Sequence, residues 1–200
     1  MPRPPVLAIV EDIADRGYAV VPAFLSSRDV AALRGGAIAR ERAGGFAPAA
    51  VGRGASRTVR DSVRGDRIRW IETDRATAPE RRLLATLDVL RLALNRELQL
   101  GLSDLEAHYA IYPAGAGYAR HVDRFHDDDA RVLSLVLYLN ARWRAEEGGA
   151  LRIDAGRDGV VEVAPVGGTL IAFLSERFPH EVLPATRTRM SIAGWLRRLR

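Results

Sequence analysis

The chain lacks cysteine and lysine altogether. The absence of cysteine excludes disulfides, thiolate metal sites, iron–sulfur clusters and cysteine nucleophiles, and it is compatible with a reducing cytosol. Any metal must therefore be bound by histidine and carboxylate side chains. Long apolar runs are lacking too, because Glu11 and Asp12 end the apolar stretch Val6–Val10. That stretch is too short for a signal peptide or a membrane-spanning helix, so we expect a cytoplasmic protein that binds no membrane.

The positive charge of the chain comes entirely from arginine, with 30 arginines, no lysine and a formal net charge of +5. Together with abundant Ala, Gly and Leu, this usage indicates the coding bias of a GC-rich genome more than selection for a basic patch. The net charge is also modest beside the concentrated positive stripe of many nucleic-acid-binding proteins. We therefore do not favour nucleic acid as a partner.

The length of 200 residues fits a single domain, and no repeat or interdomain linker divides it. Hydrophobic spacing and capping signals predict a helical and strand-containing support over residues 1–104. Its predicted helices are Val6–Asp15, about Arg28–Arg42 with Ser27 as the cap, and Pro79–Leu98, and its predicted strands are Tyr18–Val21 and Arg67–Glu72. Residues 44–63 are rich in Gly, Ala, Ser and Arg without a hydrophobic period, which predicts a long loop.

The second part of the chain, about residues 105–196, has the pattern of short strands. In Leu105–Tyr112 the alternation puts Glu106, His108 and Tyr112 on one face and the intervening apolar residues on the other. The further predicted strands are Arg131–Leu139, Ala150–Asp154, Val160–Val163, Gly168–Leu174 and Arg189–Trp195. Short strands after a helical start predict a mainly β fold with supporting helices, a double-stranded β-helix (jelly roll, cupin-like). A parallel sheet is disfavoured because crossover helices are lacking.

The motif His121-Val122-Asp123 is the first candidate metal site. In a strand, side chains two residues apart point to the same face and can reach one ion. His180 is the best further ligand, since we expect His108 to line the barrel or core and His126 to lie in a polar turn. Two imidazoles and one carboxylate leave coordination positions open, which suits non-haem Fe(II) oxygenases, although the same ligands bind manganese, nickel or zinc.

Arg189 follows His180 by nine residues, on the next candidate strand. An arginine that points into a barrel is costly unless an anion accompanies it. Its planar guanidinium suits bidentate capture of a carboxylate, such as the distal carboxylate of 2-oxoglutarate. Tyr138 has the opposite parity to its leucine neighbours, so its hydroxyl can join that anchor.

At this point the sequence resembles the prolyl 4-hydroxylase branch of the Fe(II)/2-oxoglutarate-dependent dioxygenases, in particular the oxygen-sensing prolyl hydroxylases and their bacterial relatives. The likeness runs from about residue 16 to residue 196. It is carried by Tyr112-Pro113, Gly117 to Asp123, Tyr138-Leu139-Asn140, Gly148 to Ile153, Pro179 to Val182 and Arg189 to Trp195, and in the first half by Val20–Leu25, Arg64-Gly65-Asp66 and Trp70-Ile71-Glu72.

The resemblance implies roles for the matching residues. His121, Asp123 and His180 would bind Fe(II), while Arg189 and Tyr138 would bind the distal carboxylate of 2-oxoglutarate. Tyr112, Leu151 and Trp195 would line the pocket. Residues 44–63 would be a mobile loop that closes over the substrate, with Arg64, Asp66 and Trp70 at its base. The implied cosubstrates are 2-oxoglutarate and O2, with ascorbate as an auxiliary reductant.

The activity that the resemblance implies is hydroxylation of a prolyl residue in a protein or peptide, with formation of succinate and CO2. For a bacterial member, elongation factor Tu is a suggested substrate. The same chemistry on a free amino acid, a small metabolite or an alkylated nucleic acid remains an alternative. A jelly-roll module that binds metal without turnover is a further alternative. A cupin-like isomerase with another divalent metal is a third, but it gives Arg189 no role.

Overall fold

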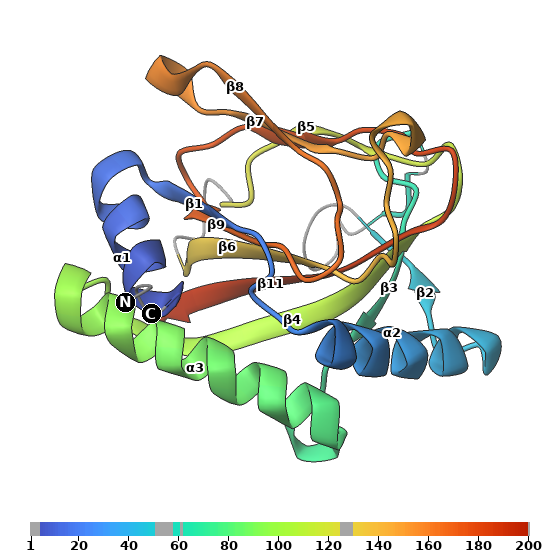
Figure 1. Ribbon diagram of the computed structural model, residues 1–200, viewed down its shortest axis with the longest axis horizontal. Coiled ribbons are helices and arrows are strands. Elements are labelled where there is room, and N and C mark those ends of the chain that lie inside the picture. The colour runs from blue at the N-terminus through green and yellow to red at the C-terminus, as the bar shows by residue number, and fades with distance from the viewer. Residues whose placement is uncertain (1–4, 51–57, 61, 125–129, 200) are drawn as a thin grey trace.

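The computed structural model describes residues 5–50, 58–60, 62–124 and 130–199. In this part of the chain the strands form two antiparallel sheets. The larger sheet has seven strands in the order β1-β9-β6-β11-β4-β3-β2, and the smaller has four in the order β5-β10-β7-β8. Figure 1 shows the helices along one side of the large sheet and the small sheet across its other side. The predicted mainly β fold with supporting helices is confirmed.

The elements have the following bounds. The α-helices among the described residues are α1 (Pro5–Arg16), α2 (Ser27–Arg42) and α3 (Ala78–Leu98). The strands of the large sheet are β1 (Tyr18–Val21), β2 (Ala47–Pro48), β3 (Arg67–Trp70), β4 (Leu102–Tyr112), β6 (Arg131–Tyr138), β9 (Leu170–Leu174) and β11 (Arg189–Arg198). The strands of the small sheet are β5 (Tyr118–His121), β7 (Leu151–Asp154), β8 (Val160–Val163) and β10 (His180–Val182).

The supporting helices lie close to where the sequence predicts them. One detail differs, since the cap of α2 is Ser26 and not Ser27. The Ser26 hydroxyl accepts a hydrogen bond from the Asp29 backbone N–H at 3.1 Å, which satisfies one of the free donors of the first turn. In α3, Leu83, Leu87, Leu90 and Leu94 are buried against the sheet, as the helical spacing predicts.

The alternation along β4 separates the protein core from a cavity between the sheets. Ala107, Tyr109 and Ile111 belong to the core cluster that also contains the buried faces of the helices. Glu106, His108 and Tyr112 line the cavity, as the alternation predicts. The large sheet therefore has one face covered by helices and the other directed at a site between the two sheets.

Several predictions about loops lie outside the described residues. They concern residues 51–57 and 61 of the 44–63 segment and residues 125–129 of the turn that contains His126. The described beginning of the 44–63 segment includes the short strand β2, which pairs with β3. The predicted loop thus begins as the edge of the large sheet.

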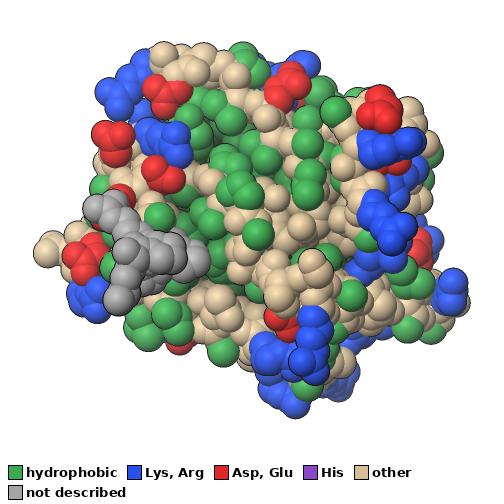
Figure 2. Space-filling view, in the orientation of Figure 1, with side chains coloured by type: hydrophobic (Ala, Val, Ile, Leu, Met, Phe, Trp, Pro, Cys, Tyr) green, Lys and Arg blue, Asp and Glu red, His purple; other side chains and the backbone are tan. Residues whose placement is uncertain are grey.

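Figure 2 displays one face of the molecule. Arginine side chains lie around its margin, several of them beside acidic side chains, and the middle consists of hydrophobic side chains and backbone. No helix in the described ranges is long and apolar enough to cross a membrane.

Candidate active site

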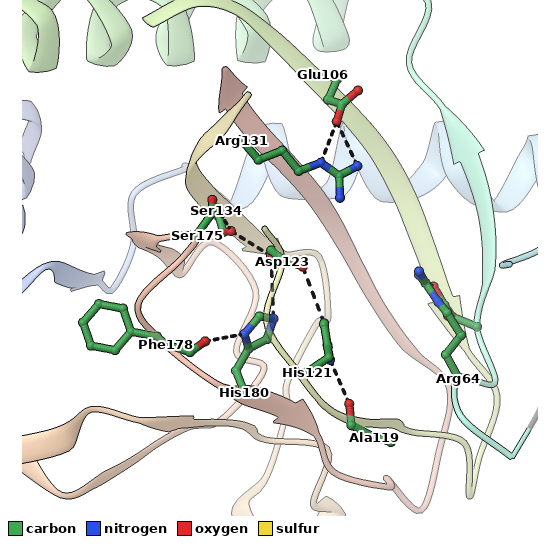
Figure 3. A network of polar contacts seen from close by, with 11 residues as sticks. Arg64, Glu106, Ala119, His121, Asp123, Arg131, Ser134, Ser175, Phe178 and His180 are labelled. Atoms are coloured by element: carbon green, nitrogen blue, oxygen red, sulfur yellow. Dashed lines mark hydrogen bonds and ion pairs between the residues drawn. The ribbon is translucent and has the colours of Figure 1, made fainter. Parts of the chain in front are cut away.

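Two histidines and one aspartate meet between the sheets. His121 ends β5 and His180 begins β10, and these two residues are paired across the small sheet. Asp123 lies two residues beyond β5, and its carboxylate oxygens are 3.5 Å from Nε2 of His121 and 3.7 Å from Nε2 of His180. One candidate ligand atom from each residue lies within 4.8 Å of the other two. Figure 3 shows the three side chains converging.

The position of Asp123 corrects the local structure that the sequence predicts. The motif does not lie in one strand, because β5 ends at His121 and the chain bends there. The carboxylate reaches the imidazoles through that bend and through a hydrogen bond from β6. The Ser134 hydroxyl donates to Oδ2 of Asp123 at 2.7 Å. The three residues still converge, but not by strand alternation.

The two imidazoles are held in the orientation that a metal needs. Nδ1 of His121 lies 2.8 Å from the Ala119 carbonyl oxygen, and Nδ1 of His180 lies 2.9 Å from the Phe178 carbonyl oxygen. Since a carbonyl only accepts, these contacts assign the proton to Nδ1 in each ring. The lone pair of each Nε2 is then directed at the centre of the site, which is the usual outer-sphere arrangement of ligating histidines.

Electrostatics favours the ligating protonation states. Burial raises the pKa of Asp123, but the neighbouring His180 and His121 and the Ser134 hydroxyl outweigh it and hold the pKa far below its usual range. Burial lowers the pKa of His180. An ionised carboxylate beside a neutral imidazole is the form that binds a divalent cation.

The hydroxyl of Ser134 is a support of the metal site that the sequence did not reveal. Ser134 and Ser175 are buried, and their hydroxyl oxygens lie 2.9 Å apart. Replacing Ser134 by Ala is expected to weaken Mn(II) binding about 10-fold, because supporting hydrogen bonds orient metal ligands. Anaerobic metal titration measures the Kd, and Ser103→Ala, which removes a hydroxyl that binds the Arg197 carbonyl oxygen, is the control. Equal affinity of Ser134→Ala and wild type would contradict this role.

Arg189 forms the closed end of the same cavity. It is 1% exposed, its Nε donates to the Gly149 carbonyl oxygen at 3.0 Å, and its Nη1 donates to the Ser191 hydroxyl at 3.3 Å. Nη2 is buried without a hydrogen-bond partner among the residues that the structure describes. Buried cations are normally paired, so this guanidinium fits an anionic ligand.

Two tyrosines flank the guanidinium of Arg189. Its central carbon lies 5.1 Å from the ring centroid of Tyr112 and 5.0 Å from that of Tyr138. Burial raises the pKa of both phenols, so each keeps its hydroxyl proton as a possible donor. Leu151 adds an apolar wall. The cavity that joins Arg189 to the histidines and the aspartate has a volume of about 400 Å³.

Arg64 and Asp66 form a bidentate ion pair at 2.6 and 2.7 Å beside this cavity. Asp66 is 2% exposed, and the Arg64 guanidinium lies 4.5 Å from the ring centroid of Tyr118, which stacks on His121. The pair therefore connects the start of β3 to the strand that carries a candidate ligand. Trp70, at the other end of β3, is 41% exposed and stands at the open side of the cavity.

The cavity thus contains the two features that Fe(II) and 2-oxoglutarate require. Two imidazoles and a carboxylate suit Fe(II), and a buried guanidinium whose Nη2 has no partner among the described residues suits the distal carboxylate of the oxoacid. Comparison with known proteins gives the same answer. The 2OG-Fe(II) oxygenase superfamily matches residues 107–197. The crystal structure of a Pseudomonas putida prolyl-4-hydroxylase has 43% sequence identity and a TM-score of 0.89, covering 98% of this chain and 100% of that chain. The chain belongs to the 2OG-Fe(II) oxygenase superfamily.

Other relatives of this oxygenase are prolyl hydroxylases as well. Mouse prolyl hydroxylase EGLN3 is 35% identical over 82% of this chain, which spans 66% of the mouse protein. A Trichoplax adhaerens prolyl hydroxylase, solved with a hypoxia inducible factor peptide, has 28% identity and a TM-score of 0.84, covering 95% of this chain and 87% of that one. These likenesses confirm the jelly-roll fold, and the superfamily implies Fe(II), 2-oxoglutarate and O2.

The structure of this oxygenase also adds residues at the open side of the cavity. Glu106 pairs with Arg131 at 2.9 Å and with Arg197 at 2.9 Å. The Arg131 guanidinium lies 3.5 Å from the ring centroid of Trp195. Arg197 was not among the predicted site residues, but it belongs to β11 and lines the cavity. Glu106 shares a strand face with His108 and Tyr112, and this alternation was the sequence signal that could have placed Glu106 at the cavity as the partner of these arginines.

Proposed function

We propose that this chain is an Fe(II)- and 2-oxoglutarate-dependent dioxygenase that hydroxylates a prolyl residue of a protein substrate. The proposal is carried by two features of one cavity, namely the His121, Asp123 and His180 cluster and Nη2 of Arg189, which has no hydrogen-bond partner among the described residues. A cupin-like isomerase gives that guanidinium no role. The prolyl specificity rests on the similarity to prolyl hydroxylases.

In this proposal His121, Asp123 and His180 hold Fe(II), and Arg189 with Tyr138 holds the distal carboxylate of 2-oxoglutarate. Bound iron with O2 and 2-oxoglutarate supplies the oxidising chemistry that adds one oxygen atom to substrate and leaves succinate and CO2. The chain supplies binding and orientation. The carbonyls that fix both Nδ1 atoms keep the imidazole lone pairs directed at the metal, and Ser134 fixes the carboxylate.

The remaining site residues determine the shape of the cavity and the access of water and substrate to it. Tyr112, Leu151 and Trp195 line the cavity and limit the water that enters it. Arg64 and Asp66 anchor the beginning of β3, where the 44–63 segment rejoins the sheet, and Trp70 lies at the open side. The predicted closure of the 44–63 segment over the substrate involves residues 51–57 and 61, which lie outside the described residues. The same proposal includes ascorbate as an auxiliary reductant and a cytoplasmic location. It also treats residues 1–200 as a single domain.

An aerobic incubation with Fe(II), 2-oxoglutarate and proline-containing peptides tests the function. The expected result is succinate formation that depends on peptide, together with the gain of one oxygen atom on proline by mass spectrometry. Elongation factor Tu is the first protein substrate to test, as the resemblance to bacterial prolyl hydroxylases suggests. Oxygen transfer to a free amino acid or a methylated nucleic acid would refute the substrate class, and binding without succinate would refute the enzyme.

A further inference from the structure

His108 is a buried polar residue to which no role has been given above. It lies in β4, it is 2% exposed, and it lines the cavity. Neither Nδ1 nor Nε2 has a hydrogen-bond partner within the described residues. Polar groups buried in proteins nearly always have partners, and phenylalanine would fill the same space without that cost. The imidazole therefore indicates a ligand that hydrogen-bonds to it.

The place of His108 along β4 separates it from the oxoacid end of the cavity. Tyr112, Ala110, His108 and Glu106 follow one another along the lining face of this strand. Four residues of extended strand span about 13 Å, so His108 lies well away from Tyr112 and Arg189. Its neighbour across the sheet is the partly exposed Trp70. This end of the cavity therefore reaches the protein surface, where a large substrate has access.

Two indoles hold the imidazole in place. The ring centroid of His108 lies 4.8 Å from that of Trp70 and 5.5 Å from that of Trp195, with an angle of 29° between the planes of His108 and Trp195. The indole Nε1 of Trp195 is also buried without a hydrogen-bond partner in the part of the chain that the structure describes. Two stacked rings that line the same cavity thus carry three nitrogens without a partner among the described residues.

The charge around His108 selects the kind of group that it binds. Burial, with a smaller contribution from Arg64, lowers the pKa of His108 to about 4, so the ring is neutral at pH 7. A neutral imidazole has one donor and one acceptor. The nearby Glu106 is paired with both Arg131 and Arg197. A neutral group with both a donor and an acceptor fits here better than a phosphate or a carboxylate.

We propose that His108 is a specificity-determining residue that hydrogen-bonds to a backbone amide of the polypeptide substrate, close to the target proline. This inference rests on the proposed prolyl hydroxylase function. A peptide backbone offers both N–H donors and carbonyl acceptors, so either nitrogen of a neutral imidazole can form a hydrogen bond with it. Trp70, which lies beside His108 and is 41% exposed, provides apolar surface for the flanking side chains of the peptide.

The variants His108→Phe and His108→Gln test the hydrogen bond. The probe is the capped peptide with a central proline that wild type hydroxylates fastest in a synthetic library. His108→Phe keeps an aromatic ring between the indoles but loses both nitrogens, so kcat/KM for the peptide is expected to fall about 10-fold, the effect of about one hydrogen bond. His108→Gln retains a donor and an acceptor and is expected to recover most of that loss.

Two further measurements separate recognition from a structural role. Because phenylalanine removes two unsatisfied nitrogens from the interior, His108→Phe is expected to melt at or above the wild-type Tm. A structural histidine predicts a lower Tm and an equal rise in the KM values for peptide and 2-oxoglutarate. Replacing the peptide's amides one at a time by esters is expected to cost wild type about 10-fold at one position and to cost His108→Phe nothing there.

The outcomes distinguish this inference from the proposed function. Wild-type kcat/KM for the peptide in His108→Phe, or the same ester profile in both proteins, would overturn the role of His108 while prolyl hydroxylation stands. Succinate formation by wild type without hydroxylation of any proline peptide would overturn the proposed function, and the role of His108 would fall with it.

Discussion

Replacing Asp123 by Ala is expected to lower substrate-dependent succinate formation by about 1,000-fold or more. Asp123 is the only anion of the three candidate ligands, and both imidazoles lie within 3.7 Å of its oxygens. A metal centre contributes several kcal/mol of charge stabilisation, and about 4 kcal/mol corresponds to about 1,000-fold in rate. Succinate is measured under saturating Fe(II), 2-oxoglutarate and the peptide that wild type hydroxylates.

A thermal melt and a matched aspartate show whether the loss arises at the metal. Mn(II) added without oxygen is expected to raise the Tm of wild type and not of Asp123→Ala, because only a folded protein with an intact site gains stability from binding. Asp154→Ala is the control, since Asp154 at the end of β7 makes an exposed ion pair with Arg120 of β5. A rate above one tenth of wild type in Asp123→Ala would contradict the assignment of this ligand.

The fold could be predicted from the sequence wherever its signals are local. The strand Tyr18–Val21 was predicted with the bounds that the structure has. Alternation along β4 placed Tyr109 in the core and Tyr112 on the cavity side, because the side-chain period of a strand needs no knowledge of its partners. The cap of α2 was missed because two serines are adjacent there, and only the bond to Asp29 identifies Ser26.

The identities of the candidate metal residues could be predicted, but their geometry could not. The sequence places His121 and Asp123 two residues apart, which suggests a shared strand face. Where β5 ends is decided by its pairing with β10, and the carboxylate is then held by Ser134 from β6. Both contacts join segments far apart in the chain. No pattern within residues 118–123 contains that information.

The role that we propose for His108 could not be predicted from the sequence for a related reason. Its place on the lining face of β4 was predicted, together with Glu106 and Tyr112. Whether a histidine in a barrel is satisfied depends on its spatial neighbours, and here these are the indoles of Trp70 from β3 and Trp195 from β11. Neither indole accepts a hydrogen bond at its nitrogen. The unpartnered state is therefore a property of the packed structure.

Replacing Arg189 by Met is expected to raise the KM for 2-oxoglutarate about 100-fold or more. Truncating one member of a buried charge pair costs about 2 to 5 kcal/mol, and each 1.4 kcal/mol is about tenfold in affinity. Arg189→Lys keeps the charge but loses the planar fork, so an intermediate KM is expected. The control is Arg187→Lys, an exposed arginine that binds the carbonyl oxygens of Ala141 and Arg142.

The stability of Arg189→Met without ligand distinguishes an anion site from a structural arginine. In wild type the guanidinium is buried with Nη2 unpartnered among the described residues, which opposes folding, while its bonds to Gly149 and Ser191 favour it. These effects offset each other, so the variant is expected to unfold within about 2 kcal/mol of wild type. Its Tm is expected not to rise with 2-oxoglutarate, whereas that of wild type rises. A large loss of stability together with an unchanged KM for 2-oxoglutarate would mean that Arg189 supports the fold and does not bind the oxoacid.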